Sequence, residues 1–268
     1  MTIGVLDSGI GGLAILREIH AHLPGEDLLY IADQAHLPYG PRPLEEVQDY
    51  TEGITRYLLA QGAKLIVIAC NTASAAALHP LRATFPTTPF VGLEPAIRPA
   101  AQATGNGVIG VIATAATFQG KLYASLIERF AQGTTVIARA CPEFVLLAER
   151  GAPWSAADYA LVADTLAGIR HAGADHLVLG CTHFSFLTPL LQAALGPAVT
   201  IVDPAPAIAR RVGAVLTERA AHQKAERPPR LTLCTTGNVG VFREQVARLV
   251  GLAHASFCGL GWQDGVLR

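Results

Sequence analysis

The chain has 268 residues, of which 51% are hydrophobic and 15% charged, so it can bury a substantial core and does not belong to the disordered class. A formal net charge of −1 provides no basic surface for nucleic acid or an anionic membrane, and no apolar run reaches the roughly 20 residues that span a bilayer. Strand-like sequence begins at Ile3, which leaves no room for a targeting peptide, and we therefore expect a cytoplasmic protein.

Short aliphatic runs alternate with helical patterns through the first part of the chain. We predict strands at 2–6, 28–32, 65–69 and 90–92, and helices at 13–22, 44–61 and 74–84. The segment 34–43 is a loop of restricted freedom, because two of its prolines flank Tyr39 and Gly40.

The same alternation continues in the second part, where IGVI at 109–112 echoes IGVL at 3–6. We predict strands at 107–112, 135–139, 176–180, 200–202 and 231–235, and helices at 118–131, 143–150, 156–172, 205 to Lys224, and 242–250. Strands that alternate with helices indicate parallel sheets. The predicted fold is α/β, with two Rossmann-like or flavodoxin-like domains related by pseudo-symmetry, one of residues 1–95 and 208–268 and the other of residues 96–207.

Two related stretches carry the most specific signal. LIVIACNTAS at 65–74 recurs as HLVLGCTHFS at 176–185, which places Cys181 at 111 residues after Cys70. Each aliphatic run is typical of a strand buried on both faces, and ligands of open α/β sheets bind beyond the carboxyl ends of such strands. We therefore predict that the two thiols face each other across one substrate.

Two opposed thiols suit the inversion of a carbon atom next to a carboxylate. One thiol removes a proton from one face and the other returns a proton to the opposite face, and the reference pKa of Cys, near 8.5, lies close to working pH. We expect thiolates to be favoured, because both cysteines precede helices whose N–H groups point outward. Residues that follow them can donate hydrogen bonds to a substrate carboxylate, namely Asn71, Thr72, Thr182 and His183.

The remaining cysteines suggest no other chemistry. Five cysteines, odd in number and without a Cys-x-x-Cys pair, argue against a disulfide framework and for reduced thiols. Cys141, Cys234 and Cys258 are interpreted as structural or surface thiols. No metal site is predicted, because Cys181 and His183 lie two residues apart without a second ligand pair.

Several motifs resemble those of the cofactor-independent glutamate racemases. They are DSGIGG at 7–12, ADQAHLPYG at 32–40, ACNTAS at 69–74, CPEFVLLAE at 141–149, LGCTHF at 179–184 and TTG at 235–237. The resemblance implies two α/β domains with the active site between them, no cofactor, and interconversion of L- and D-glutamate that supplies D-glutamate for peptidoglycan. The expected partner is thus a small-molecule substrate, glutamate, and the resemblance is also compatible with a homodimer.

The same resemblance assigns roles to individual residues. Cys70 and Cys181 would be the proton donor and acceptor pair, with Asp7 assisting Cys70 and His183 assisting Cys181. The substrate would be held by Asp7, Ser8, Tyr39, Gly40, Asn71, Thr72, Thr182 and His183. Asp33 and Glu149 match further acidic positions of the family. Leu146 and Ser185 stand where the family often has proline, and Gln119 where it often has serine.

Other interpretations stay open. Asp7 and Ser8 are good helix caps, Asp33 suits a turn, and Glu149 suits a solvated helix surface. The pattern Gly9, Gly11, Ala14, with an acid 19 residues after Ala14, also fits a dinucleotide fingerprint, although Asp7 places negative charge where pyrophosphate would sit.

The alternative functions are therefore an aspartate-type racemase, which usually has Glu where His183 stands, and a nucleotide- or metabolite-binding regulatory protein. Pyridoxal phosphate is not expected, because none of Lys64, Lys121 and Lys224 is placed for a Schiff base.

Overall fold

The computed structural model describes residues 1–223 and 227–268. The helix predicted from 205 to Lys224 ends already at Glu218, and Lys224 itself lies outside the described residues. The first half of the molecule is built from these elements: β1 (Thr2–Asp7), α1 (Leu13–His22), β2 (Leu28–Ala32), α2 (Leu44–Ala60), β3 (Ala63–Ile68), α3 (Asn71–Thr84), β4 (Phe90–Gly92), α10 (Ala205–Glu218), β9 (Leu231–Thr235), α11 (Val239–Val250) and β10 (Ser256–Gly259). Their strands form a parallel sheet in the order β10-β9-β2-β1-β3-β4. A hairpin of β11 (Trp262–Gln263) and β12 (Val266–Leu267) follows.

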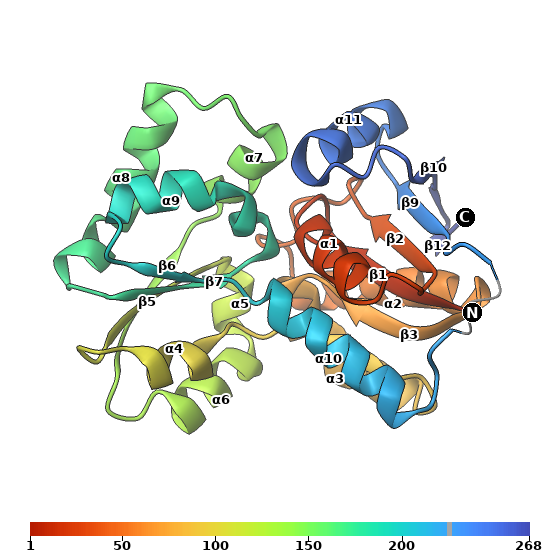
Figure 1. Cartoon of the computed structure of the whole chain (residues 1–268), viewed down its shortest axis with the longest axis horizontal. Helices are drawn as coiled ribbons and strands as arrows, with labels where there is room; N and C mark the ends of the chain where they lie inside the picture. Colours follow the sequence, from red (N-terminus) through yellow and green to blue (C-terminus); the bar gives the residue numbers. More distant parts are fainter. Residues whose placement is uncertain (224–226) are drawn as a thin grey trace.

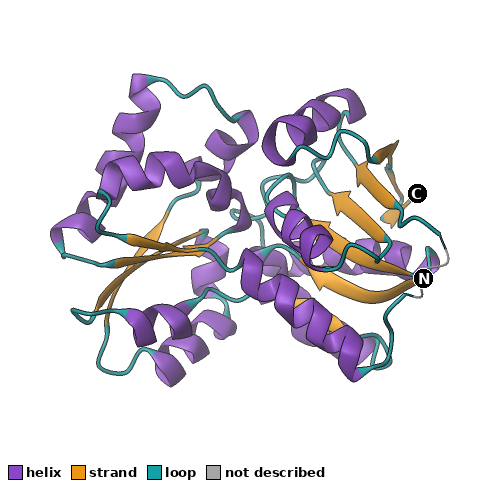
Figure 2. Ribbon diagram, in the orientation of Figure 1, coloured by secondary structure: helices purple, strands orange, loops and turns teal. Residues whose placement is uncertain are grey.

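The second half contains α4 (Ile97–Ala103), β5 (Val108–Ala113), α5 (Ala115–Gln119), α6 (Lys121–Phe130), β6 (Thr135–Ala140), α7 (Glu143–Arg150), α8 (Ala156–His171), β7 (His176–Gly180), the 3-10 helix η1 (Thr182–Leu187), α9 (Thr188–Leu195) and β8 (Thr200–Val202). Its parallel sheet has the order β6-β5-β7-β8. Figures 1 and 2 show the two sheets side by side, each between layers of helices.

Each sheet separates two hydrophobic layers, as near-continuous aliphatic strands require. In the first half, α1, α10 and α11 pack on one face and α2 and α3 on the other. In the second half, α7, α8, η1 and α9 cover one face, and α4 and α6 cover the other. The core strands are fully buried on both faces, which explains why they lack polar alternation.

The two halves repeat one topology. The order β2-β1-β3-β4 in the first sheet matches β6-β5-β7-β8 in the second, strand for strand. The predicted fold class, two parallel-sheet units related by pseudo-symmetry, is confirmed. The domain boundaries drawn from the sequence stay a prediction. No helix within the described ranges is long and apolar enough to cross a membrane.

Several local predictions differ from the structure, among them the start of α11, which lies at Val239 and not at 242. Helix α3 begins at Asn71 rather than Ser74, because Cys70 caps it by accepting a hydrogen bond from the Ala73 N–H. The helix predicted at 118–131 is divided by Gly120, whose backbone is extended. After Cys181 the chain forms η1 and then α9, neither of which was predicted.

The prediction of reduced thiols is wrong for two of the five cysteines. Cys234 and Cys258 form a disulfide, whereas Cys141 is free and buried. The bond joins neighbouring residues of β9 and β10, which pair in register. The sequence does not indicate this bond, because SFCG at 256–259 lacks a strand pattern and no predicted strand pairing places the two residues together.

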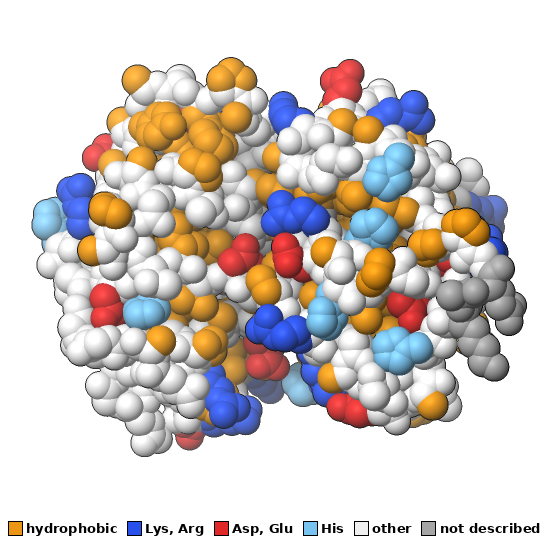
Figure 3. All heavy atoms as spheres, viewed as in Figure 1, with side chains coloured by type: hydrophobic (Ala, Val, Ile, Leu, Met, Phe, Trp, Pro, Cys, Tyr) orange, Lys and Arg blue, Asp and Glu red, His pale blue; other side chains and the backbone are white. Residues whose placement is uncertain are grey.

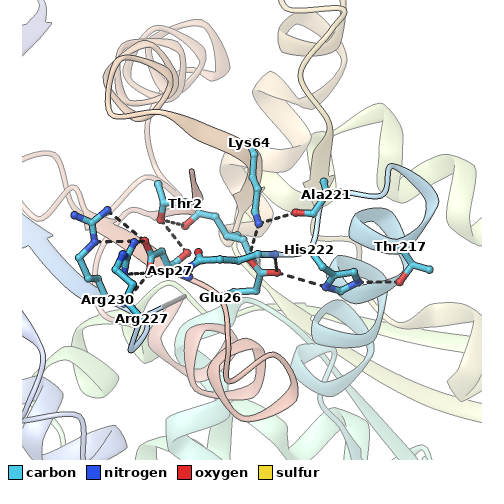
Figure 4. A network of polar contacts seen from close by, with 11 residues as sticks. Thr2, Glu26, Asp27, Lys64, Thr217, Ala221, His222, Arg227 and Arg230 are labelled. Atoms are coloured by element: carbon cyan, nitrogen blue, oxygen red, sulfur yellow. Dashed lines mark hydrogen bonds and ion pairs between the residues drawn. The ribbon is translucent and has the colours of Figure 1, made fainter. Parts of the chain in front are cut away.

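A buried ionic network lies at the amino-terminal edge of the first sheet, at the end opposite to Cys70 (Figure 4). Glu26 and Asp27, which precede β2, are 3% and 1% exposed. Lys64 donates to Glu26, and Arg227 and Arg230 donate to Asp27. Buried carboxylates need such partners, so this network fixes the segment that leads into β9 against the sheet.

Candidate active site

The two halves meet where the carboxyl ends of their central strands converge. The strand order of each sheet reverses between two neighbours, β1 and β3 in one and β5 and β7 in the other. Such switch points are where open α/β sheets bind ligands. Asp7 ends β1, Cys70 follows β3 and Cys181 follows β7. The Thr182 hydroxyl donates to Asp7 Oδ2 at 3.1 Å and joins the two switch points directly.

Cys70 is a buried thiol at the amino end of α3. Its Sγ accepts from the Ala73 N–H at 3.4 Å and lies 4.0 Å from Ser8 Oγ. Burial and the nearby Asp7 carboxylate raise the pKa of Cys70 well above its usual value, so the expectation of a favoured thiolate is wrong here. A negative charge on Cys181 would raise the pKa of Cys70 further.

Asp7 is a fully buried carboxylate that titrates near neutrality. Burial raises its pKa to about 6, although the His183 charge and hydrogen bonds from Gly9, Gly12 and Thr182 oppose the rise. Asp7 does not cap the following helix, because the residue preceding α1 is Gly12 and no side chain caps it. A carboxylate with this pKa is suited to exchange protons near pH 7.

Cys181 is connected to an imidazole and a carboxylate. His183 Nδ1 lies 3.9 Å from Cys181 Sγ, and His183 Nε2 lies 2.9 Å from Glu149 Oε1. Burial would lower the pKa of His183, but hydrogen bonds with Cys181 and Glu149 raise it well above its usual value. The pKa of Glu149 is lowered, since hydrogen bonds and the charge of His183 outweigh its burial. The Glu149 side chain is 11% exposed, so the interpretation of a solvated surface residue is wrong.

The glycine-rich turn after β1 packs against Glu149, Thr182 and His183. A Cβ on Gly9 would lie 2.1 Å from Glu149 Oε1, and one on Gly11 would lie 2.4 Å from Thr182 Oγ1. Both glycines are therefore needed for side chains of the other half to approach the turn. The space that a pyrophosphate would occupy in a dinucleotide fingerprint is filled by Glu149 and His183, so that alternative loses its support.

Asp33 is more than a turn residue. It is fully buried and accepts hydrogen bonds from the Tyr39 hydroxyl at 2.7 Å, the Thr236 hydroxyl at 2.8 Å and the Trp262 indole at 2.8 Å. These contacts hold the loop 34–43 over the site. A Cβ on Gly40 would lie 2.9 Å from the Cβ of Thr114, so this loop also touches the other half.

Polar side chains with unused hydrogen-bonding capacity line the Cys70 side. Asn71 is 3% exposed, and neither Nδ2 nor Oδ1 of its amide has a partner among the residues that the structure describes. Thr72 Oγ1 lies 2.9 Å from Thr114 Oγ1, which lies 2.9 Å from Thr117 Oγ1. Buried polar groups in this state are suited to bind a ligand.

The sequence reasoning missed Thr114, Thr117, Thr236 and Trp262. A signal existed for Thr114, which follows β5 as Ser8 follows β1, at the end of a repeated strand. No signal pointed to Trp262, because its contact with Asp33 spans 229 residues and depends on the path of the C-terminal hairpin.

Comparisons with known proteins agree on one family. Residues 3–212 match the family model described as Asp/Glu/Hydantoin racemase. A glutamate racemase of Roseiflexus sp. (strain RS-1) is 46% identical over 248 residues, which cover 92% of this chain and 91% of the relative.

Two solved structures extend the agreement to the fold. A glutamate racemase isoform from Bacillus anthracis superposes with a TM-score of 0.87 at 32% identity, covering 99% of this chain and 98% of the other. The Escherichia coli glutamate racemase in complex with L-glutamate and the activator UDP-MurNAc-ala gives a TM-score of 0.84 at 31% identity, covering 96% and 97%.

Proposed function

Because the chain belongs to the Asp/Glu/hydantoin racemase family, we propose that it is an enzyme that interconverts L- and D-glutamate and supplies D-glutamate for peptidoglycan. The 46% identity to a glutamate racemase over nearly the whole chain favours glutamate over the aspartate-type alternative. A regulatory protein that only binds a metabolite would not need two thiols, each with its own acid/base partner.

The observation that carries the proposal is the pairing of each thiol with a different proton acceptor. Cys70 Sγ lies 4.0 Å from the hydroxyl of Ser8, the residue after Asp7, and Cys181 lies beside the His183–Glu149 pair. The two groups come from opposite halves of the molecule. This arrangement supports two separate acid/base units directed at one α-carbon.

In the forward step one thiolate removes the α-proton, which breaks the C–H bond on one face of glutamate. The thiol on the other face then donates its proton to the carbanion and forms the new C–H bond. Asp7 receives the Cys70 proton when Cys70 is to act as the base, and His183 does the same for Cys181. No electrons are exchanged, and the reverse reaction uses the same groups in the opposite order.

Substrate binding is assigned to the polar groups that surround Cys70 and Cys181. They are Asp7, Ser8, Tyr39, Gly40, Asn71, Thr72, Thr182 and His183, with Asp33 orienting Tyr39. The unpartnered amide of Asn71 and the hydroxyl chain that begins at Thr72 support this assignment.

The test is a circular dichroism assay of both enantiomers after exhaustive chelation and dialysis, with Cys70→Ser and Cys181→Ser beside the wild type. Loss of either acid/base group should lower the rate by more than roughly 100-fold. Cys141→Ser, which changes a buried free thiol outside the pair, is the matched control. A mild effect of either site variant would contradict the two-thiol assignment.

A cytoplasmic location and a homodimer stay predictions. The Cys234–Cys258 disulfide removes one argument for the cytoplasm, since that argument relied on reduced cysteines. Fractionation of the host cell and sedimentation of the purified protein would test the two predictions separately.

A further inference from the structure

The carboxylate that supports His183 is saturated with hydrogen bonds. Glu149 Oε1 accepts from the Ile10 N–H at 3.0 Å and lies 2.9 Å from His183 Nε2. Glu149 Oε2 accepts from Gln245 Nε2 at 3.2 Å and from Gln34 Nε2 at 3.3 Å. One oxygen therefore faces the imidazole while two amides hold the other.

The side-chain amides of Gln34 and Gln245 are hydrogen-bonded to each other, and every N–H of the two amide groups has an acceptor. Gln245 Oε1 accepts from Gln34 Nε2 at 3.0 Å, and Gln34 Oε1 accepts from the Thr235 hydroxyl at 2.8 Å. These contacts fix which end of each amide is the donor, so both Nε2 atoms point to Glu149. A fully satisfied polar network of this kind holds its members in one orientation.

The chain of amides crosses from one half of the molecule to the other. Thr235 ends β9 and Gln34 lies two residues after β2. Gln245 belongs to α11, whereas Glu149 belongs to α7. Figure 1 shows α11 and α7 facing each other across the top of the molecule, and Figure 3 shows basic and acidic side chains meeting along the seam between the halves.

Helix α11 also caps the end of α7. Gln245 Nε2 donates to the Glu149 carbonyl at 3.0 Å, and the Arg248 guanidinium donates to the Arg150 carbonyl at 3.1 Å. The last carbonyls of a helix have no partner within it, so these side chains satisfy groups that would otherwise be unpaired. Gln245, which is 8% exposed, thus contacts both the backbone and the carboxylate of Glu149.

We propose that Gln245, aided by Gln34, is a positioning residue that aims Glu149 at His183 and thereby sets the rate of proton transfer at Cys181 but not at Cys70. The inference rests on the function proposed above. Without the amides, Glu149 can rotate away from His183, and the His183–Cys181 pair loses its alignment.

The consequence is an asymmetry between the two enantiomers that a general loss of structure would not produce. When Cys181 is the base, slower transfer there makes removal of the α-proton more rate-limiting. When Cys181 is the acid, the α-proton has already left to Cys70, and slower donation makes that first transfer less rate-limiting. The α-deuterium isotope effect on kcat/KM should therefore rise for one enantiomer and fall for the other.

The experiment measures these isotope effects with α-deuterated L- and D-glutamate for the wild type, Gln245→Leu and Glu149→Gln. We expect Gln245→Leu to lower kcat by roughly 10- to 100-fold, with KM within about twofold, and to move both isotope effects in the same directions as Glu149→Gln. Gln192→Leu is the matched control, because its amide also donates to two carbonyls, those of Gly196 and Val199, away from the site.

Unchanged isotope effects in a folded Gln245→Leu protein would overturn the proposal, as would equal shifts in Gln192→Leu. If Gln245→Leu fails to fold, Gln34→Leu removes the other donor to Oε2 and must produce the same pair of opposite shifts. A wild type that does not racemise glutamate would instead refute the proposed function, so the two failures are distinguishable.

Discussion

Substitution of Gly11 by alanine should damage catalysis more than folding. A Cβ at Gly11 would lie 2.4 Å from Thr182 Oγ1, 2.5 Å from His183 Nδ1 and 2.8 Å from the backbone nitrogen of His183. Ordinary contacts begin at 3.4 Å, so even the backbone contact requires His183 to retreat by 3.4 − 2.8 = 0.6 Å.

That retreat moves the imidazole that serves Cys181. A misplacement of about 1 Å can cost about 100-fold in rate, so Gly11→Ala should lower kcat by roughly 10- to 100-fold. The overpacking should cost roughly 1–3 kcal/mol in the free energy of unfolding. Urea titration measures the loss of stability, and kcat measured under conditions where both proteins are folded gives the loss of catalysis separately.

The matched control is Gly25→Ala, since a Cβ there meets nothing within 4 Å and the backbone does not have a positive φ. It should leave kcat and stability close to those of the wild type. A Gly11→Ala enzyme with kcat within about twofold of the wild type would refute the reasoning. The glycine-rich turn would then not require close approach of the other half.

Three further predictions concern stability. Burial raises the pKa of Asp7 from 3.8 to about 6, so the contribution of its carboxyl group to stability is present below pH 4 and is lost as the pH rises through 6. At pH 7, Asp7→Asn should therefore lose activity but have a free energy of unfolding up to roughly 3 kcal/mol higher than that of the wild type. Urea titrations at pH 4 and pH 7 check the difference. Reduction of the Cys234–Cys258 disulfide, whose cysteines are 24 residues apart, should lower the unfolding free energy by roughly 3 kcal/mol, and no change on verified reduction would contradict this. Lys64→Met should lower the free energy of unfolding by roughly 3–5 kcal/mol, because it leaves the Glu26 carboxylate buried without its ammonium partner. Thermal melts should show that the double variant Glu26→Gln with Lys64→Met is destabilised less than Lys64→Met alone.

The repeated strands made most of the fold accessible from the sequence. Aliphatic runs without polar alternation identify strands that are buried on both faces, and the recurrence of one cysteine motif predicts matching positions in two sheets. The match between β2-β1-β3-β4 and β6-β5-β7-β8 follows the same repetition. The helix α4, the strand β10 and the C-terminal hairpin have neither an aliphatic run nor a helical spacing of apolar residues, so the sequence does not predict them.

The environment of each thiol could not be predicted in the same way. The sequence places Cys70 before a helix, which favours a thiolate, but it does not reveal that burial and Asp7 together outweigh that effect. Likewise, Gln245 lies 96 residues from Glu149, and only the packing of α11 against α7 brings them together. Motifs identify the reacting groups, whereas the groups that aim them depend on contacts between elements that are distant in the sequence.

The proposed mechanism requires two thiols that serve opposite faces of one carbon atom, and racemisation at initial velocity in deuterated water tests this requirement most directly. If each thiol exchanges its own proton with solvent, the product from either enantiomer should carry deuterium at the α-carbon while the recovered substrate keeps its hydrogen. Deuterium in the recovered substrate, or original hydrogen retained in the product, would show that one group serves both faces and would contradict the two-thiol mechanism.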